Sequence, residues 1–281
     1  MPVLIPTTLD EALRALDERP HATILAGGTD LMVEINSGHR RVDDVVAIDR
    51  LPEMRSWRRS GDGGSLVIGA GCTYRVLMQP TLAALVPALG EASRSVGSPQ
   101  IRETGTIGGN LGTCSPAGDV LPVLAALEAT VVVESVAGRR SLPVAEFMIG
   151  VKRTALRPGE LVTEIHVPVL DGWQGYAKVG VRNAMVIAIA SACLVVDRPS
   201  RSVRLALGSV GPTILRGDEA EAFATANVDW ATGAVDDAAV GRFAELAAAA
   251  ARPIDDHRST AAYRRHAIGV LAGRLIRRAF P

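Results

Sequence analysis

Two pairs of adjacent glycines constrain this chain more than any other feature of its sequence. Residues 24–31 read ILAGGTDL and residues 104–111 read TGTIGGNL, so each pair is flanked by apolar residues and followed by a polar side chain. Glycine permits positive φ and close approach to the main chain, and consecutive N–H groups in such a turn form an anion-binding nest. The pattern predicts two turns that together hold an anion such as a pyrophosphate. Taken singly, a glycine pair is more often just a tight turn, and Thr29-Asp30 is then only the cap of a helix.

Other signatures for nucleotide binding or catalysis are missing from the sequence. No glycine precedes a lysine, as a Walker loop requires, and no GxSxG nucleophile elbow occurs. The stretch GAGCTY at 69–74 has a tyrosine where a Rossmann fingerprint needs its third glycine. The three cysteines, Cys72, Cys114 and Cys193, are too scattered for a zinc or iron–sulfur motif. We therefore predict no metal site and no catalytic side chain.

The composition is that of a globular protein whose net charge gives no reason to expect a highly charged partner. The 281 residues are 48% hydrophobic with a formal net charge of +0, so nothing favours nucleic acid. No apolar run approaches the roughly 20 residues of a membrane span. The N-terminal residues lack the features of a signal peptide, and a cytoplasmic location is expected. Positive charge is almost all arginine, with Lys152 and Lys178 the only lysines, which makes both worth attention.

Hydrophobic periodicity predicts an α/β portion followed by a different C-terminal part. Helices are expected from residue 8, over 82–96 and over 120–127, and strands over 22–25, 44–48, 66–69, 130–133 and 161–167. After a turn at 170–172 come β-type runs over 176–181, 186–196 and 203–210. The last 65 or so residues are expected to be helical, with their arginines mostly in solvent. His166, inside an apolar run, is expected to point outward from its strand.

Several motifs together resemble the FAD-binding subunit of molybdenum hydroxylases, the family of xanthine dehydrogenase and carbon monoxide dehydrogenase. They are AGGTDL at 26–31, QIRETGTIGGNL at 100–111, SPAGD at 115–119, GEL at 159–161, YAKV at 176–179, RNA at 182–184, DHRS at 256–259 and YRR at 263–265. They occur in order over nearly the whole chain. The stretch AGGTDLMVEINSGHRR is slightly more similar to xanthine or aldehyde dehydrogenase-type subunits than to those of carbon monoxide dehydrogenase.

The resemblance implies an α+β fold in two domains. Residues 1–168 would form a two-part FAD-binding domain of the PCMH (vanillyl-alcohol-oxidase-like) type, with subdomains of about 1–55 and 56–168. Residues 169–281 would form a C-terminal domain of antiparallel sheet plus helices.

The resemblance also implies FAD as the cofactor and a set of residues that bind it. Two glycine loops would enclose the FAD pyrophosphate with backbone N–H groups. Asp119 would contact the adenosine end or simply cap the next helix, and Lys178 would lie near the flavin or point into water. Val162 would cover the ring, while Met185 and Ile187 would replace an aromatic residue that some relatives have there. The implied cofactor-binding set is Leu25, Ala26, Gly27, Gly28, Thr29, Asp30, Leu31, Thr106, Ile107, Gly108, Gly109, Asn110, Asp119, Val162 and Lys178.

The implied function is electron transfer inside a larger complex. A molybdopterin-binding large subunit and a [2Fe-2S] small subunit would be the partners, in a dimer of heterotrimers. This chain would pass electrons from an iron–sulfur cluster through FAD to NAD, quinone or oxygen. The alternatives are a self-contained FAD-dependent reductase or oxidase with the same fold, and an interaction protein that has lost the cofactor.

Overall fold

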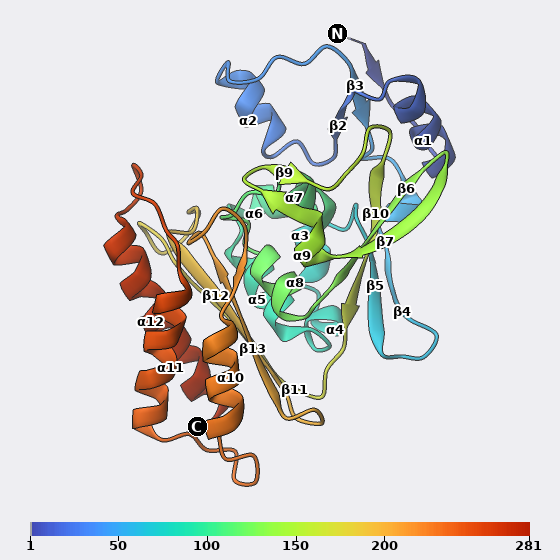
Figure 1. Ribbon diagram of the computed structural model, residues 1–281. Helices are drawn as coiled ribbons and strands as arrows, with labels where there is room; N and C mark the ends of the chain where they lie inside the picture. The colour runs from blue at the N-terminus through green and yellow to red at the C-terminus, as the bar shows by residue number, and fades with distance from the viewer. Residues whose placement is uncertain (1) are drawn as a thin grey trace.

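The computed structural model describes residues 2–281, which form three sheets and a small hairpin surrounded by helices (Figure 1). The N-terminal part is a three-stranded parallel sheet in the order β1-β3-β2. Its elements are β1 (Val3–Leu4), α1 (Leu9–Glu18), β2 (Thr23–Leu25), α2 (Leu31–Asn36) and β3 (Val45–Ala47). Helix α1 begins as predicted, because the Thr8 side chain accepts a hydrogen bond from the Glu11 N–H. The helix buries one apolar face.

The second part is a five-stranded antiparallel sheet in the order β4-β5-β10-β6-β7, with short helices packed beside it. Its first elements are η1 (Pro52–Met54), β4 (Trp57–Arg59), β5 (Ser65–Gly69), α3 (Tyr74–Leu77), α4 (Pro80–Ala83), α5 (Pro87–Ser95), α6 (Pro99–Thr104), α7 (Ile107–Thr113) and α8 (Leu121–Ala126). They are followed by β6 (Thr130–Ser135), β7 (Gly138–Pro143), α9 (Val144–Phe147), β8 (Met148–Gly150), β9 (Arg153–Thr154) and β10 (Leu161–Pro168). The outward-facing position of His166 is confirmed, because its ring is partly exposed and contacts Glu164 at 2.9 Å.

The third part is an antiparallel sheet covered by three helices. Its elements are β11 (Gly172–Val179), β12 (Ala190–Asp197), β13 (Ser202–Gly208), β14 (Leu215–Arg216), α10 (Asp218–Asn227), α11 (Asp237–Ala250) and α12 (Ala261–Ala279). Strand β12 is apolar on both faces because both are covered: Cys193 and Val195 join the core of the second part, whereas Leu194 and Val196 join the core beneath the helices. Figure 1 shows the sheet between these two layers of helices.

The predicted antiparallel sheet with a helical tail is thus confirmed, but the tail is not uniformly solvated. Arg264 is only 3% exposed, which corrects the expectation that it faces solvent. Its guanidinium donates to the carbonyl oxygens of Ile189 (2.7 Å) and Ser209 (2.9 Å) and to the Asp256 carboxylate (2.7 Å). A buried charge is tolerated only when it is paired and hydrogen-bonded, and here it ties α12 to the ends of two strands. None of the helices in residues 2–281 is long and apolar enough to cross a membrane.

Candidate functional site

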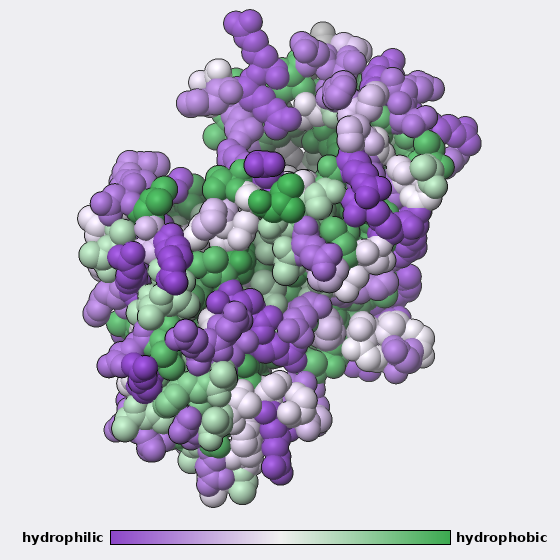
Figure 2. All heavy atoms as spheres, viewed as in Figure 1, coloured by the Kyte–Doolittle hydropathy of each residue, from purple (hydrophilic) through white to green (hydrophobic). Residues whose placement is uncertain are grey.

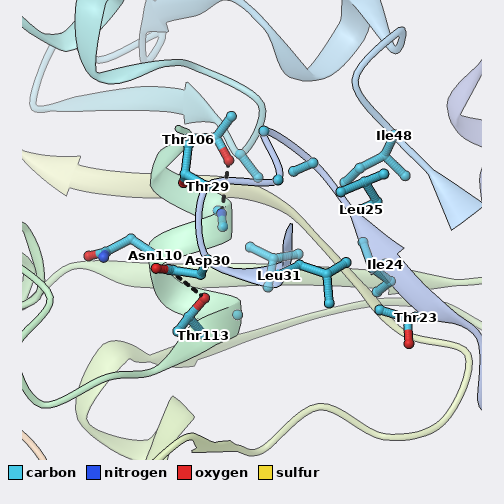
Figure 3. A pocket seen from close by; sticks show the side chains of 18 of the residues that line it. Thr23, Ile24, Leu25, Thr29, Asp30, Leu31, Ile48, Thr106, Asn110 and Thr113 are labelled. Carbon is cyan, nitrogen blue, oxygen red and sulfur yellow. Dashed lines mark hydrogen bonds between the residues drawn. The ribbon is translucent and has the colours of Figure 1, made fainter. Parts of the chain in front are cut away.

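A pocket of about 350 Å³ lies where the N-terminal sheet meets α7 and the end of β10. The loop between β2 and α2 forms one wall, and the first turns of α7 form the facing wall (Figure 3). Leu156, Leu161 and Val162 add apolar surface to its lining. The two glycine-containing stretches, nearly 80 residues apart in the sequence, therefore face the same space.

The loop that follows β2 presents unpaired main-chain donors to this pocket. The N–H groups of residues 27–31 make no hydrogen bond with any described part of the chain, and all five residues line the pocket. Gly28 has a φ of +69°, as predicted for a turn that only glycine adopts readily. Asp30 is the N-cap of α2 but makes no capping hydrogen bond. A run of free amides beside a polar cavity is suited to an anion.

Gly27 has a different role from the one the sequence suggests. A Cβ built on Gly27 would lie 1.8 Å from the carbonyl oxygen of Thr104 and 2.5 Å from its carbonyl carbon. Bare backbone is required at Gly27 because the second glycine stretch packs directly on the first. The closeness of the two walls thus depends on this glycine, whatever the pocket binds.

The second glycine pair does not form the predicted turn. Thr106 is the N-cap of α7, and Gly108 and Gly109 lie in the first turn of that helix. The amides are already used: Gly108 N–H donates to the Ala70 carbonyl (2.8 Å), and Gly109 N–H donates to the Thr106 hydroxyl (2.9 Å). A Cβ on Gly108 would lie 2.6 Å from the Cβ of Ala70, so this glycine permits helix packing. The expected second nest of amides is therefore wrong, because a side-chain cap and neighbouring carbonyls take the donors.

Two side chains of α7 complete the inner wall of the pocket. The Thr113 hydroxyl donates to the Asp30 carboxylate at 3.0 Å, which links the two glycine stretches (Figure 3). Asn110 lines the pocket, and its buried Oδ1 has no hydrogen-bond partner in the described chain. A buried oxygen without a donor is costly unless something else supplies one. Asn110 therefore does not serve the turn.

Charged side chains from α2 and from nearby segments lie at the rim of the pocket. The Lys152 ammonium, on the turn between β8 and β9, contacts the Glu34 carboxylate at 2.5 Å, and the Arg40 guanidinium approaches the same carboxylate at 3.6 Å. The hydrogen bond from Lys152 holds the pKa of Glu34 below its ordinary value. Figure 2 shows this face of the molecule hollowed, with hydrophilic residues around α2 above the hollow and hydrophobic residues below it.

Asp119 and Lys178 lie outside this pocket and form a buried ion pair. The Lys178 ammonium donates to the Asp119 carboxylate (2.7 Å) and to the Ser95 carbonyl (2.9 Å), and the Tyr176 hydroxyl donates to the other carboxylate oxygen (2.8 Å). Both charged side chains are less than one tenth exposed. Loss of water by burial raises the pKa of Asp119, and the ammonium of Lys178 partly offsets this. The two simpler alternatives are thereby excluded: Asp119 makes no helix cap, and Lys178 does not point into water.

Most of the implied cofactor-binding set lines the pocket. Residues 25–31, Thr106, Gly108, Gly109, Asn110 and Val162 do so. Ile107 is fully buried behind the wall, and Lys178 lines a separate hollow beside α5 and the segment 179–186. Met185 and Ile187, on the segment between β11 and β12, are each 54% exposed.

Sequence reasoning missed several residues that line the pocket. Tyr74 and Ala70 reach it from the start of α3 and the end of β5, where GAGCTY matched no binding pattern. Lys152 and Glu34 meet across 118 residues, and the rarity of lysine was the only signal that pointed to either of them. No cluster of His, Cys, Asp or Glu within residues 2–281 is arranged to hold a metal ion.

Two protein-family models together match most of the chain. Residues 1–170 match the family model described as the FAD binding domain in molybdopterin dehydrogenase, and residues 176–279 match the CO dehydrogenase flavoprotein C-terminal domain. The chain belongs to this family of FAD-binding subunits of molybdenum-dependent dehydrogenases.

Individual relatives cover nearly the whole chain. The glyceraldehyde dehydrogenase medium chain of Sulfolobus acidocaldarius is 34% identical over 268 residues, covering 94% of this chain and 92% of that protein. The carbon monoxide dehydrogenase medium chain of Hydrogenophaga pseudoflava is 31% identical, covering 98% and 93%. The structure of reconstituted CO dehydrogenase from Oligotropha carboxidovorans matches with a TM-score of 0.89 at 29% identity, covering 99% of this chain and 97% of that one. The family resemblance, the fold and FAD as cofactor are thereby confirmed.

The residues present fit FAD. The free amides of residues 27–31 suit its diphosphate, which is an anion that needs donors and little else. The buried Asn110 Oδ1 needs a donor, and the hydroxyl groups of FAD can provide one. The apolar residues of the lining suit a planar ring.

Proposed function

We propose that this chain carries electrons, by way of bound FAD, from the iron–sulfur clusters of a partner subunit to an external acceptor. Family membership supports this, since relatives are named as medium chains of carbon monoxide and glyceraldehyde dehydrogenases. The observation that carries the proposal is the run of free amides at residues 27–31 on the pocket wall. The proposed partners are a molybdopterin-binding large subunit and a [2Fe-2S] small subunit, assembled as a dimer of heterotrimers.

The chain's own residues would bind and orient the cofactor. The amides of residues 27–31 would hold the diphosphate, and Asn110 would accept a hydrogen bond from the cofactor through Oδ1. Helix α7 would supply no amide, and its contribution would be the wall formed by Thr106, Gly108 and Gly109. The remaining members of the implied set, Asp119 and Lys178 among them, stay proposals.

The Asp119–Lys178 pair would fix the electrostatics at the other end of the site. An ammonium that is buried and already paired cannot swing freely, so its position relative to β11 is set by the fold. A positive charge held near a flavin favours its reduced, anionic form, and the paired Asp119 carboxylate offsets part of that effect here. FAD supplies the redox chemistry when bound, and no side chain of this chain is required as a general acid or base.

Finer features of the complex also stay predictions. We propose the division into residues 1–168 and 169–281, with two subdomains in the first. A xanthine or aldehyde dehydrogenase type remains favoured on the residues around the first glycine pair, and the acceptor is NAD, quinone or oxygen. A cytoplasmic location likewise stays a prediction.

Purification tests the proposal directly. The chain should be isolated yellow, release FAD on denaturation, and copurify from its native source with subunits that contain molybdenum and iron. In the complex, the organic substrate should bleach the flavin absorbance only when the iron-containing subunit is present. A chain that neither retains nor takes up FAD contradicts the proposal, and reductant turnover by the isolated chain favours a self-contained enzyme.

A further inference from the structure

The two lysines of this chain occupy opposite kinds of environment. Lys178 is buried and paired, whereas the side chain of Lys152 is 57% exposed at the rim of the pocket. The backbone of Lys152 is fixed: its φ is +53°, and its N–H donates to the Cys114 carbonyl at 3.1 Å. The β8–β9 turn thus holds the start of this side chain at the pocket while its ammonium can change partners.

The charges that line the pocket balance one another. Asp30 and Glu34 are the carboxylates of the lining, and Arg40 and Lys152 are its arginine and lysine. Asp30 accepts from the Thr113 hydroxyl, whereas Glu34 contacts both cations. A diphosphate would therefore enter a pocket in which both cations already contact the Glu34 carboxylate.

The competitor, Glu34, lies on a helix with little buried surface. Helix α2 has no buried residue, and Met32 and Val33 on the same helix are 42% and 64% exposed. An ammonium on a flexible stem exchanges partners readily, because exposed ion pairs are weak and screened by salt.

We propose that Lys152 is a further binding residue for the diphosphate, and that the diphosphate and the Glu34 carboxylate compete for its ammonium. This rests on the proposed function, because it takes the pocket to be the FAD site. Glu34 then lowers the affinity for the cofactor, and Lys152 raises it.

Two substitutions with opposite expected signs test this competition. Glu34→Gln should tighten the binding of FAD and of ADP by about two- to fivefold, the range of an exposed ion pair, since ADP carries the same diphosphate. Lys152→Met should weaken both by a similar factor and lower the dependence of affinity on salt. Arg153→Met is the matched control, because Arg153 is the neighbouring exposed cation but does not line the pocket. Affinities are measured by quenching of flavin fluorescence and by competition with ADP.

The double variant distinguishes competition for the Lys152 ammonium from an ion pair that only holds α2 in place. If Lys152 is the main residue that Glu34 opposes, Glu34→Gln gives a smaller gain in a Lys152→Met background, and the remainder reflects Arg40, which also contacts Glu34. Persistence of the full gain in that background overturns the proposal, as does equal weakening by both single substitutions, which is the result for a pair that only holds α2 in place. Failure of the unsubstituted protein to bind FAD would instead contradict the proposed function, so the two failures are distinguishable.

Discussion

Replacement of Gly27 by alanine tests whether the two glycine stretches must touch for the pocket to form. The added Cβ would lie 1.8 Å from the Thr104 carbonyl oxygen, whereas real contacts of this kind are at least 3.0 Å. The obstacle is backbone and not the flexible end of a side chain, so one wall must move by roughly 1.2 Å. Overpacking of a well-packed region typically costs about 1–3 kcal/mol of folding free energy, and we expect a loss near the upper end.

Gly27→Ala should also weaken cofactor binding, because displacement of the wall breaks a hydrogen bond to FAD. A wall displaced by this distance lengthens a hydrogen bond of normal length beyond its useful range. A hydrogen bond to a charged group contributes about 1.5–3 kcal/mol, so the loss of one lowers FAD affinity by about 10- to 100-fold. The assays are flavin fluorescence quenching for affinity and thermal denaturation for stability.

Gly112→Ala is the matched stability control for this substitution. Gly112 lines the same pocket from α7, and a Cβ built there meets nothing within 4 Å. Alanine there should leave stability unchanged or raise it by up to about 1 kcal/mol, through helix propensity. Unchanged stability and FAD affinity in Gly27→Ala would refute the requirement for loop-to-loop contact.

Three further predictions concern other parts of the site and fold. Gly109→Val should abolish FAD binding, because the branched side chain crowds the pocket wall, and a normal flavin content after purification would show that the site is misplaced. Arg140 donates two hydrogen bonds of 2.7 Å to the Glu160 carboxylate and lowers its pKa, so the pair stabilises the fold above about pH 4.5, and this stabilisation is lost as pH falls through the lowered pKa. Glu160→Gln should cost about 2 kcal/mol of folding free energy at pH 7 and make stability less dependent on pH. Urea denaturation at several pH values measures both effects. Lys178→Met should destabilise the chain by about 3–5 kcal/mol, because it leaves the buried Asp119 charge unpaired, and the added Asp119→Asn substitution should restore part of the loss.

Much of the fold could be predicted from the sequence because it depends on local pattern. The start of α1 at Thr8, the buried strand β3 and the turn at Gly28 follow from capping, apolar alternation and glycine's access to positive φ. The β-type run over 186–196 predicts a strand, and β12 occupies residues 190–197; that both of its faces are covered is visible only in the structure.

Other features of the site depended on contacts that no local pattern encodes. Gly108 and Gly109 look like a turn in sequence, yet the Thr106 cap and the Ala70 carbonyl place them in a helix without free amides. Arg264 looks like one more solvated arginine, but it is buried against the carbonyl oxygens of Ile189 and Ser209, which are distant in sequence, and against the nearby Asp256 carboxylate.

The sequence by itself determined that this chain has two stretches of bare backbone, a helical tail and the motifs of a flavin-binding family. These are properties of residue type and spacing, which fix local conformation. Only the tertiary structure decided which stretch has amides to offer a ligand, and why the other needs its glycines. That difference arises because a backbone N–H group is available to a ligand only where no carbonyl oxygen of the protein accepts from it. The groups that contact Gly27 and Gly108 belong to segments distant in the sequence.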